Sequence, residues 1–130
     1  MSNRQVSIAV DAMGGENSPY KVLKGSEIFS KNYPDVNIIY FGNAEIIKNL
    51  IKDYKIKINN YDIVNTLENV NDDDNANTIL RNRKQSSIYK ALEYVKLNPN
   101  TGFVSAGNTA AIMILSRLLI GMIHGIDRPA

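Results

Sequence analysis

Short apolar runs alternate with amphipathic stretches along this chain. Runs rich in β-branched residues predict strands at 6–10, 36–41, 61–64 and 102–104. Apolar positions at helical spacing predict helices over 19–31, 45–53 and 86–97, with a short helical turn at 78–84. A last helix, 110–122, is apolar nearly all round, so we expect it to be buried. The segment 56–58 fits either a strand or a linker.

The order strand, helix, strand, helix with short connections predicts an α/β fold with a parallel sheet. We expect residues 1–130 to form a single α/β domain without a separate linker. Ligands of such sheets bind outside the carboxyl ends of the strands. The unusual turns of this sequence, 11–15 and 105–109, both follow predicted strands.

Composition excludes several classes of function. The 15 basic and 13 acidic residues give a net charge of +2, which argues against a dedicated nucleic-acid binder. The absence of cysteine and the single histidine, His124, exclude disulfides, thiolate metal sites and multi-histidine metal sites. The acidic run 72–74 lacks further spaced ligands and is expected to be a hydrated loop. With no export signal and no long apolar run, we expect a protein of the cytoplasm.

Two glycine-containing turns are candidate binding loops. In 105–109, Gly107 allows close approach of an anion, and Ser105, Asn108 and Thr109 add donors at the start of a helix. The alternative is a plain turn in which Asn108 or Thr109 caps that helix. The turn 11–15, with Asp11, Gly14 and Gly15, fits neither the dinucleotide fingerprint nor the Walker A pattern, which makes a dinucleotide oxidoreductase a distant alternative.

Three cations, Arg81, Arg83 and Lys84, precede the helix that begins near Ser86 or Ser87. Composition alone favours a solvated face for them. The functional alternative is contact with a phosphate or with an acidic partner, which suits arginine geometry.

Four segments, in this order and spacing, resemble the bacterial phosphate acyltransferases of the PlsX type. They are 11–19 (DAMGGENSP), 81–87 (RNRKQSS), 104–109 (VSAGNT) and 125–130 (GIDRPA). The resemblance covers the whole chain. It implies a three-layer α/β/α fold with a mainly parallel sheet, of the isocitrate dehydrogenase and phosphotransacetylase kind, here incomplete.

The resemblance also implies an activity: transfer of an acyl chain from acyl carrier protein to inorganic phosphate, which gives acyl phosphate for phospholipid synthesis. It implies no cofactor, a homodimer at full length, and a cytoplasmic enzyme, peripheral to the membrane, whose product passes to a membrane glycerol-3-phosphate acyltransferase.

Roles for individual residues follow from the same resemblance. Ser105, Gly107, Asn108 and Thr109 would hold phosphate or the developing oxyanion. Asp11, Gly14 and Gly15 would shape the opposite lip, and Arg81 and Lys84 would meet phosphate or the acidic carrier. No residue is identified as a general base.

The sequence departs from the family pattern at Ala110, where glycine is usual, and at Ala76, where proline is usual. Family chains are more than twice as long, so we expect this to be an N-terminal portion. The alternative function is a truncated, non-catalytic remnant that binds anions or another protein.

Overall fold

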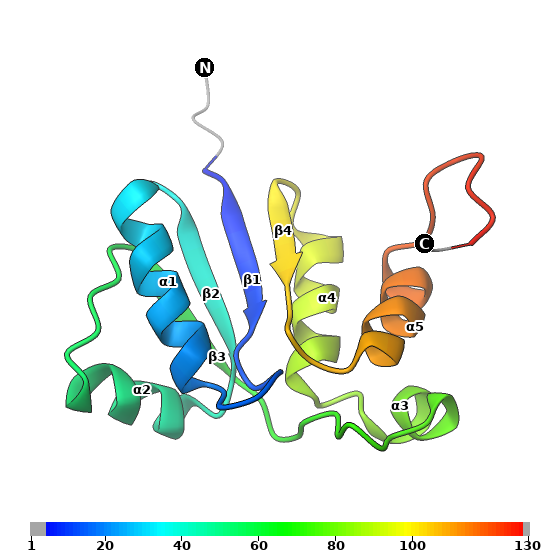
Figure 1. Ribbon diagram of the computed structural model, residues 1–130. Helices are drawn as coiled ribbons and strands as arrows, with labels where there is room; N and C mark the ends of the chain where they lie inside the picture. Colours follow the sequence, from blue (N-terminus) through cyan, green and yellow to red (C-terminus); the bar gives the residue numbers. More distant parts are fainter. Residues whose placement is uncertain (1–4, 129–130) are drawn as a thin grey trace.

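The sheet has four parallel strands in the order β3-β2-β1-β4. Figure 1 shows β2, β1 and β4 side by side. The structure is a computed structural model that describes residues 5–128. The strands are β1 (Ser7–Asp11), β2 (Asn37–Gly42), β3 (Tyr61–Asn65) and β4 (Thr101–Val104). All four predicted strands are confirmed, and the α/β fold with a parallel sheet with them.

The helices are α1 (Tyr20–Asn32), α2 (Ala44–Asp53), α3 (Ala76–Asn82), α4 (Ser87–Leu97) and α5 (Thr109–Leu119). Their positions agree with the predicted helices to within a few residues. The segment 56–58 is not a strand, although Ile56 and Ile58 are buried in the core.

Helices cover both faces of the sheet, because successive side chains of a strand point to opposite sides. Val10 and Tyr40 pack with Leu23 of α1 on one face. Their neighbours Ala9 and Phe41 pack with Ala91 of α4 on the other. Figure 1 shows α1 and α4 on opposite sides of the strands. The arrangement is therefore a three-layer α/β/α fold, with β3 and β4 at the two edges of its sheet.

Polar side chains fix where four of the helices begin. Asn43, Asn75, Ser86 and Asn108 each accept a hydrogen bond from the amide three residues further on. Such caps satisfy amides that have no partner inside the helix. Of the two serines proposed for α4, Ser86 is the cap and Ser87 is the first helical residue.

Helix α5 is not buried all round, and that expectation is wrong. Only Ala111 and Leu115 are buried, while the side chain of Leu118 is 60% exposed. The helix packs on one side only, against α3 and α4. It also ends at Leu119, earlier than predicted, because Gly121 adopts a positive φ of 94° and its amide bonds back to the carbonyl of Ser116.

Within residues 5–128, no helix has both the length and the apolar character needed to cross a bilayer.

Candidate functional site

The carboxylate of Asp11 organises the carboxyl end of the sheet. Asp11 is the last residue of the central strand β1 and is only 4% exposed. Its Oδ1 accepts hydrogen bonds from the Ser87 hydroxyl at 2.6 Å and from the Met13 amide at 3.2 Å. Its Oδ2 accepts one from the Ser105 hydroxyl at 2.8 Å. One buried carboxylate thus joins the turn after β1, the start of α4 and the turn after β4.

Sequence reasoning missed Ser87. Its side chain is 2% exposed and lies 76 positions from Asp11 along the chain. The only signal was the Ser86-Ser87 pair: one hydroxyl suffices to cap the helix, so the other needs a different partner. Nothing in the spacing identified that partner as Asp11.

The two predicted binding turns touch each other, and glycine allows the contact. A Cβ on Gly14 would lie 2.5 Å from Oδ2 of Asp11 and 2.9 Å from the amide nitrogen of Gly107. Gly15 has a φ of 94°, in the left-handed region that favours glycine. The structure therefore brings Asp11, Gly14, Gly15 and Gly107 together.

Ser105 faces this cluster rather than open solvent. Its hydroxyl donates to Asp11, and its oxygen accepts the amide of Gly107 at 3.0 Å. The Ser105 hydroxyl, one of the donors predicted to hold an anion, is thus used inside the protein, and so is the amide of Gly107. Their effect is to fix the shape of the turn.

Asn108 caps α5, as in the alternative interpretation of its turn. Its Oδ1 accepts the amide of Ala111 at 3.0 Å. Its Nδ2 donates to the carbonyl oxygens of Asn71 at 3.0 Å and Asp72 at 3.4 Å. The next two amides, of Thr109 and Ala110, make no hydrogen bond within residues 5–128. These amides are the donors that remain at the N-terminus of α5.

A polar cavity of about 560 Å³ opens beside these turns. It is lined by Asp11, residues 13–16, residues 69–72, Ser87, Ile88 and residues 106–108. Three of its lining residues, Asp11, Glu16 and Asp72, are acidic, and none is lysine or arginine. An anion bound here would therefore depend on backbone amides and on the helix dipole.

The three cations that precede α4 have different surroundings. Arg83 forms two hydrogen bonds with Asp74, from Nε at 2.8 Å and from Nη2 at 3.1 Å. This guanidinium lowers the pKa of the Asp74 carboxyl. Asp74 also accepts the amide of Asn71 at 2.8 Å, so the pair anchors the loop that Asn108 contacts. Arg81 and Lys84 are exposed and do not line the polar cavity.

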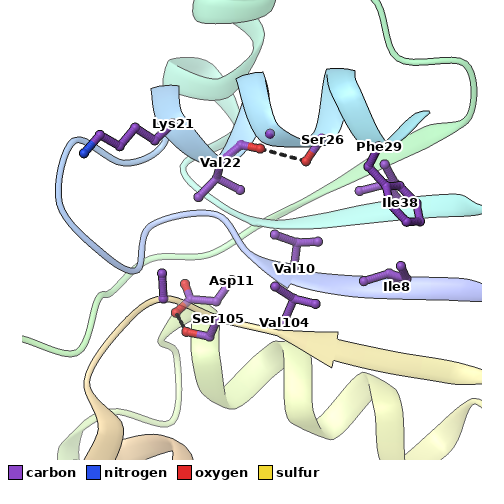
Figure 2. A pocket seen from close by; sticks show the side chains of 12 residues that line it. Ile8, Val10, Asp11, Lys21, Val22, Ser26, Phe29, Ile38, Val104 and Ser105 are labelled. Atoms are coloured by element: carbon purple, nitrogen blue, oxygen red, sulfur yellow. Dashed lines mark hydrogen bonds between the residues drawn. The ribbon is translucent and has the colours of Figure 1, made fainter. Parts of the chain in front are cut away.

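A second cavity, of about 340 Å³, lies between α1 and strands β1 and β4 (Figure 2). Most of its lining side chains are apolar: Ile8, Val10, Val22, Phe29, Ile38 and Val104. Asp11 and Ala106 line both cavities. The apolar cavity thus begins at the residues that bound the polar one.

Comparison with known proteins gives a consistent result. A family model described as "Fatty acid synthesis protein" matches residues 6–130. The phosphate acyltransferase of Leuconostoc mesenteroides is 38% identical over 125 residues, which are 96% of this chain and 35% of that protein. The phosphate acyltransferase of Limosilactobacillus reuteri is 40% identical over 124 residues, 95% of this chain and 35% of the relative. That of Caldicellulosiruptor saccharolyticus is 37% identical over 125 residues, 96% of this chain and 37% of the relative.

This chain spans a little over a third of the length of these curated relatives. The match nevertheless covers all four strands and both glycine-containing turns around Asp11. On that match, the chain belongs to the fatty acid synthesis protein family, whose members among its relatives are phosphate acyltransferases.

Proposed function

We propose that this chain forms part of an enzyme that transfers an acyl group from acyl carrier protein to inorganic phosphate. Family membership and the names of the relatives support the reaction class. The structural observation that carries the proposal is the polar cavity at the carboxyl end of the sheet, which is lined by Asn108, the cap of α5. The next two amides of that helix end, of Thr109 and Ala110, make no hydrogen bond within residues 5–128. Two such amides at a helix N-terminus suit a phosphate.

In the proposed reaction a phosphate oxygen attacks the thioester carbonyl carbon. A carbon–oxygen bond forms, the carbon–sulfur bond breaks, and the carrier thiolate leaves and takes up a proton. Phosphate is already anionic near neutral pH, so the site needs no strong general base. Its contribution is to position the phosphate and to stabilise the negative charge that develops on the carbonyl oxygen.

The residues around Asp11 take two kinds of role in this proposal. Thr109 and the start of α5 hold the phosphate, with Asn108 fixing the helix end. Asp11, Ser105 and Gly107 are positioning residues, since their donors and acceptors are used on one another. Because Gly14 and Gly15 have no side chains, the turn after β1 can lie against the turn after β4.

The carrier would dock beside the site. Acyl carrier proteins are acidic, and two exposed cations lie near the end of α3: Arg81 in its last turn and Lys84 in the connection to α4. We include both in the proposed docking surface. Arg83 is left out because its guanidinium is paired with Asp74.

At full length we propose a cytoplasmic homodimer that acts at the membrane surface. Its acyl phosphate would serve a membrane glycerol-3-phosphate acyltransferase.

The test measures acyl phosphate formed from acyl carrier protein and phosphate. The chain is assayed alone and then mixed with the region of the Leuconostoc relative that it does not match. We expect little turnover alone and clear turnover in the mixture, since a site shared between two regions loses its geometry when one is absent. Phosphate binding without turnover in the mixture would instead favour a non-catalytic anion-binding remnant.

A further inference from the structure

The apolar cavity between α1 and the sheet has a polar end and an apolar end. Figure 2 shows Lys21, Asp11 and Ser105 at one end and Ile8, Phe29 and Ile38 at the other. Val10 and Val104, which are register partners on neighbouring strands, lie between them. A ligand that fits this gradient has a polar head and a hydrocarbon tail.

Helix α1 leaves room for such a tail at Gly25. This glycine lies inside the helix and lines the cavity. A Cβ built on it would meet no atom within 4 Å, so no contact in the described residues requires glycine there. Glycine has a lower helix propensity than alanine, which makes its presence a cost to the helix. Space for a ligand is a physical reason to keep it.

The cavity adjoins the polar site, and this position favours one occupant over others. Asp11 and Ala106 line both cavities, and the Ser105 hydroxyl that bonds Asp11 lines the apolar one. A molecule whose reacting carbonyl lies at the turn after β4 can therefore place its tail along β1 and β4. The cavity volume of about 340 Å³ is within the range of small-molecule sites.

We propose that this groove binds the alkyl chain of the acyl substrate, with the carbonyl end directed toward the turn after β4 and the start of α5. The inference rests on the proposed function and adds the location of the chain. From Asp11 to Ile8 the groove follows three residues of β1, roughly 10 Å at the usual strand rise. That length suits a medium or long saturated chain and is far more than an acetyl group requires.

The test titrates the 130-residue chain with saturated carboxylates from butanoate to dodecanoate and follows amide chemical shifts. We expect affinity to rise about fourfold per added methylene until the groove is filled. The shifts should map to Ile8, Val22, Gly25 and Val104. Affinity that does not depend on chain length, or shifts that map elsewhere, would overturn the proposal.

Substitution at Gly25 makes the test specific. Gly25→Leu fills the groove from a helix that tolerates leucine well, so dodecanoate affinity should fall at least tenfold while the fold persists. Gly25→Ala should lower dodecanoate affinity less. Lys31→Leu should leave it unchanged, because Lys31 is exposed on the same helix and does not line the groove. Equal dodecanoate affinity in the wild type and Gly25→Leu would refute the assignment.

Two further measurements are needed. One distinguishes an alkyl ligand in the groove from a second copy of the protein, and the other tests the phosphate site separately from the groove. Sedimentation of the same samples shows whether a second copy fills the groove; a dimer that Gly25→Leu dissociates, without dodecanoate binding, would overturn the alkyl assignment. Phosphate titration of the Thr109 and Ala110 amides tests the proposed function separately. Dodecanoate binding with no phosphate response would leave the groove proposal standing and contradict the phosphate site.

Discussion

The hydroxyl of Ser87 donates a 2.6 Å hydrogen bond to Oδ1 of Asp11, joining the first turn of α4 to the end of β1. Both side chains are almost completely buried. A buried carboxylate is stable only when donors replace the water it has lost. This contact is therefore one of three that hold the negative charge at the centre of the site.

Replacing Ser87 should destabilise the protein. We expect Ser87→Ala to lower the free energy of unfolding by about 1–3 kcal/mol, because the buried carboxyl group of Asp11 loses a hydrogen-bond donor. Urea denaturation measures the change. Ser116→Ala on α5, whose side chain makes no hydrogen bond within residues 5–128, is the matched control and should change stability little. An equal loss of unfolding free energy in both variants would mean that the hydrogen bond to Asp11 does not stabilise the protein specifically.

Gly14 should not accept a side chain. In Gly14→Ala the new methyl group would collide with Oδ2 of Asp11 and the backbone of Gly107, so we expect a loss of about 1–3 kcal/mol and movement of the turn 105–109. Gly102→Ala in β4 is the control, since a Cβ there meets no atom within 4 Å. Thermal unfolding and amide shifts of both variants decide the matter, and an unperturbed Gly14→Ala would show that the two turns do not pack as described.

Asn108 makes two kinds of contact, one with the start of α5 and one with the loop at residues 71 and 72. Asn108→Ala removes the cap and the contacts with residues 71 and 72, and should cost about 0.5–2 kcal/mol. Asn108→Asp keeps an oxygen for the Ala111 amide but adds a negative charge beside the proposed phosphate position. We therefore expect Asn108→Asp to bind phosphate more weakly than Asn108→Ala. Phosphate titration followed by amide shifts of Thr109 tests this order, and the reverse order would place phosphate elsewhere.

The exposed cations Arg81 and Lys84 should matter for carrier binding. The double variant Arg81→Gln, Lys84→Gln should weaken binding of acyl carrier protein and flatten its salt dependence, because steering between opposite charges is screened by salt. Lys48→Gln with Lys52→Gln on α2 makes the same change in net charge at exposed positions far from the site in sequence. Calorimetric titration at several salt concentrations compares them. If both pairs behave alike, the effect is one of net charge, and Arg81 and Lys84 are only a solvated face.

The Asp74–Arg83 pair should make stability depend on pH in the acid range. The Arg83 guanidinium lowers the pKa of Asp74 below its ordinary value of 3.8. The pair therefore stabilises the folded protein above that ordinary value, and its contribution is lost as the pH falls through the lowered pKa. The urea midpoint of Arg83→Gln should lie below that of the wild type at neutral pH and approach it in acid. Arg117→Gln is the control, and a constant difference at all pH values would contradict the assignment.

The periodicity of the sequence was sufficient to predict the parallel sheet, its helices and the two turns that carry the site. Strand and helix patterns repeat over a few residues, so they can be recognised locally. The glycines at 14, 15 and 107 were also visible in the sequence, and the carboxyl-end rule placed them at one edge of the sheet.

Tertiary structure alone decided which side chains meet there. The bonds from Ser87 and Ser105 to Asp11 join residues 76 and 94 positions apart, which no local pattern encodes. The apolar composition of α5 did not reveal that only one side of that helix has neighbours. Burial and hydrogen-bond partners depend on how distant segments pack together, whereas helices and strands depend mainly on residues close in sequence. For this protein the sequence determined the elements and the edge at which the site lies, and packing determined the chemistry of that site.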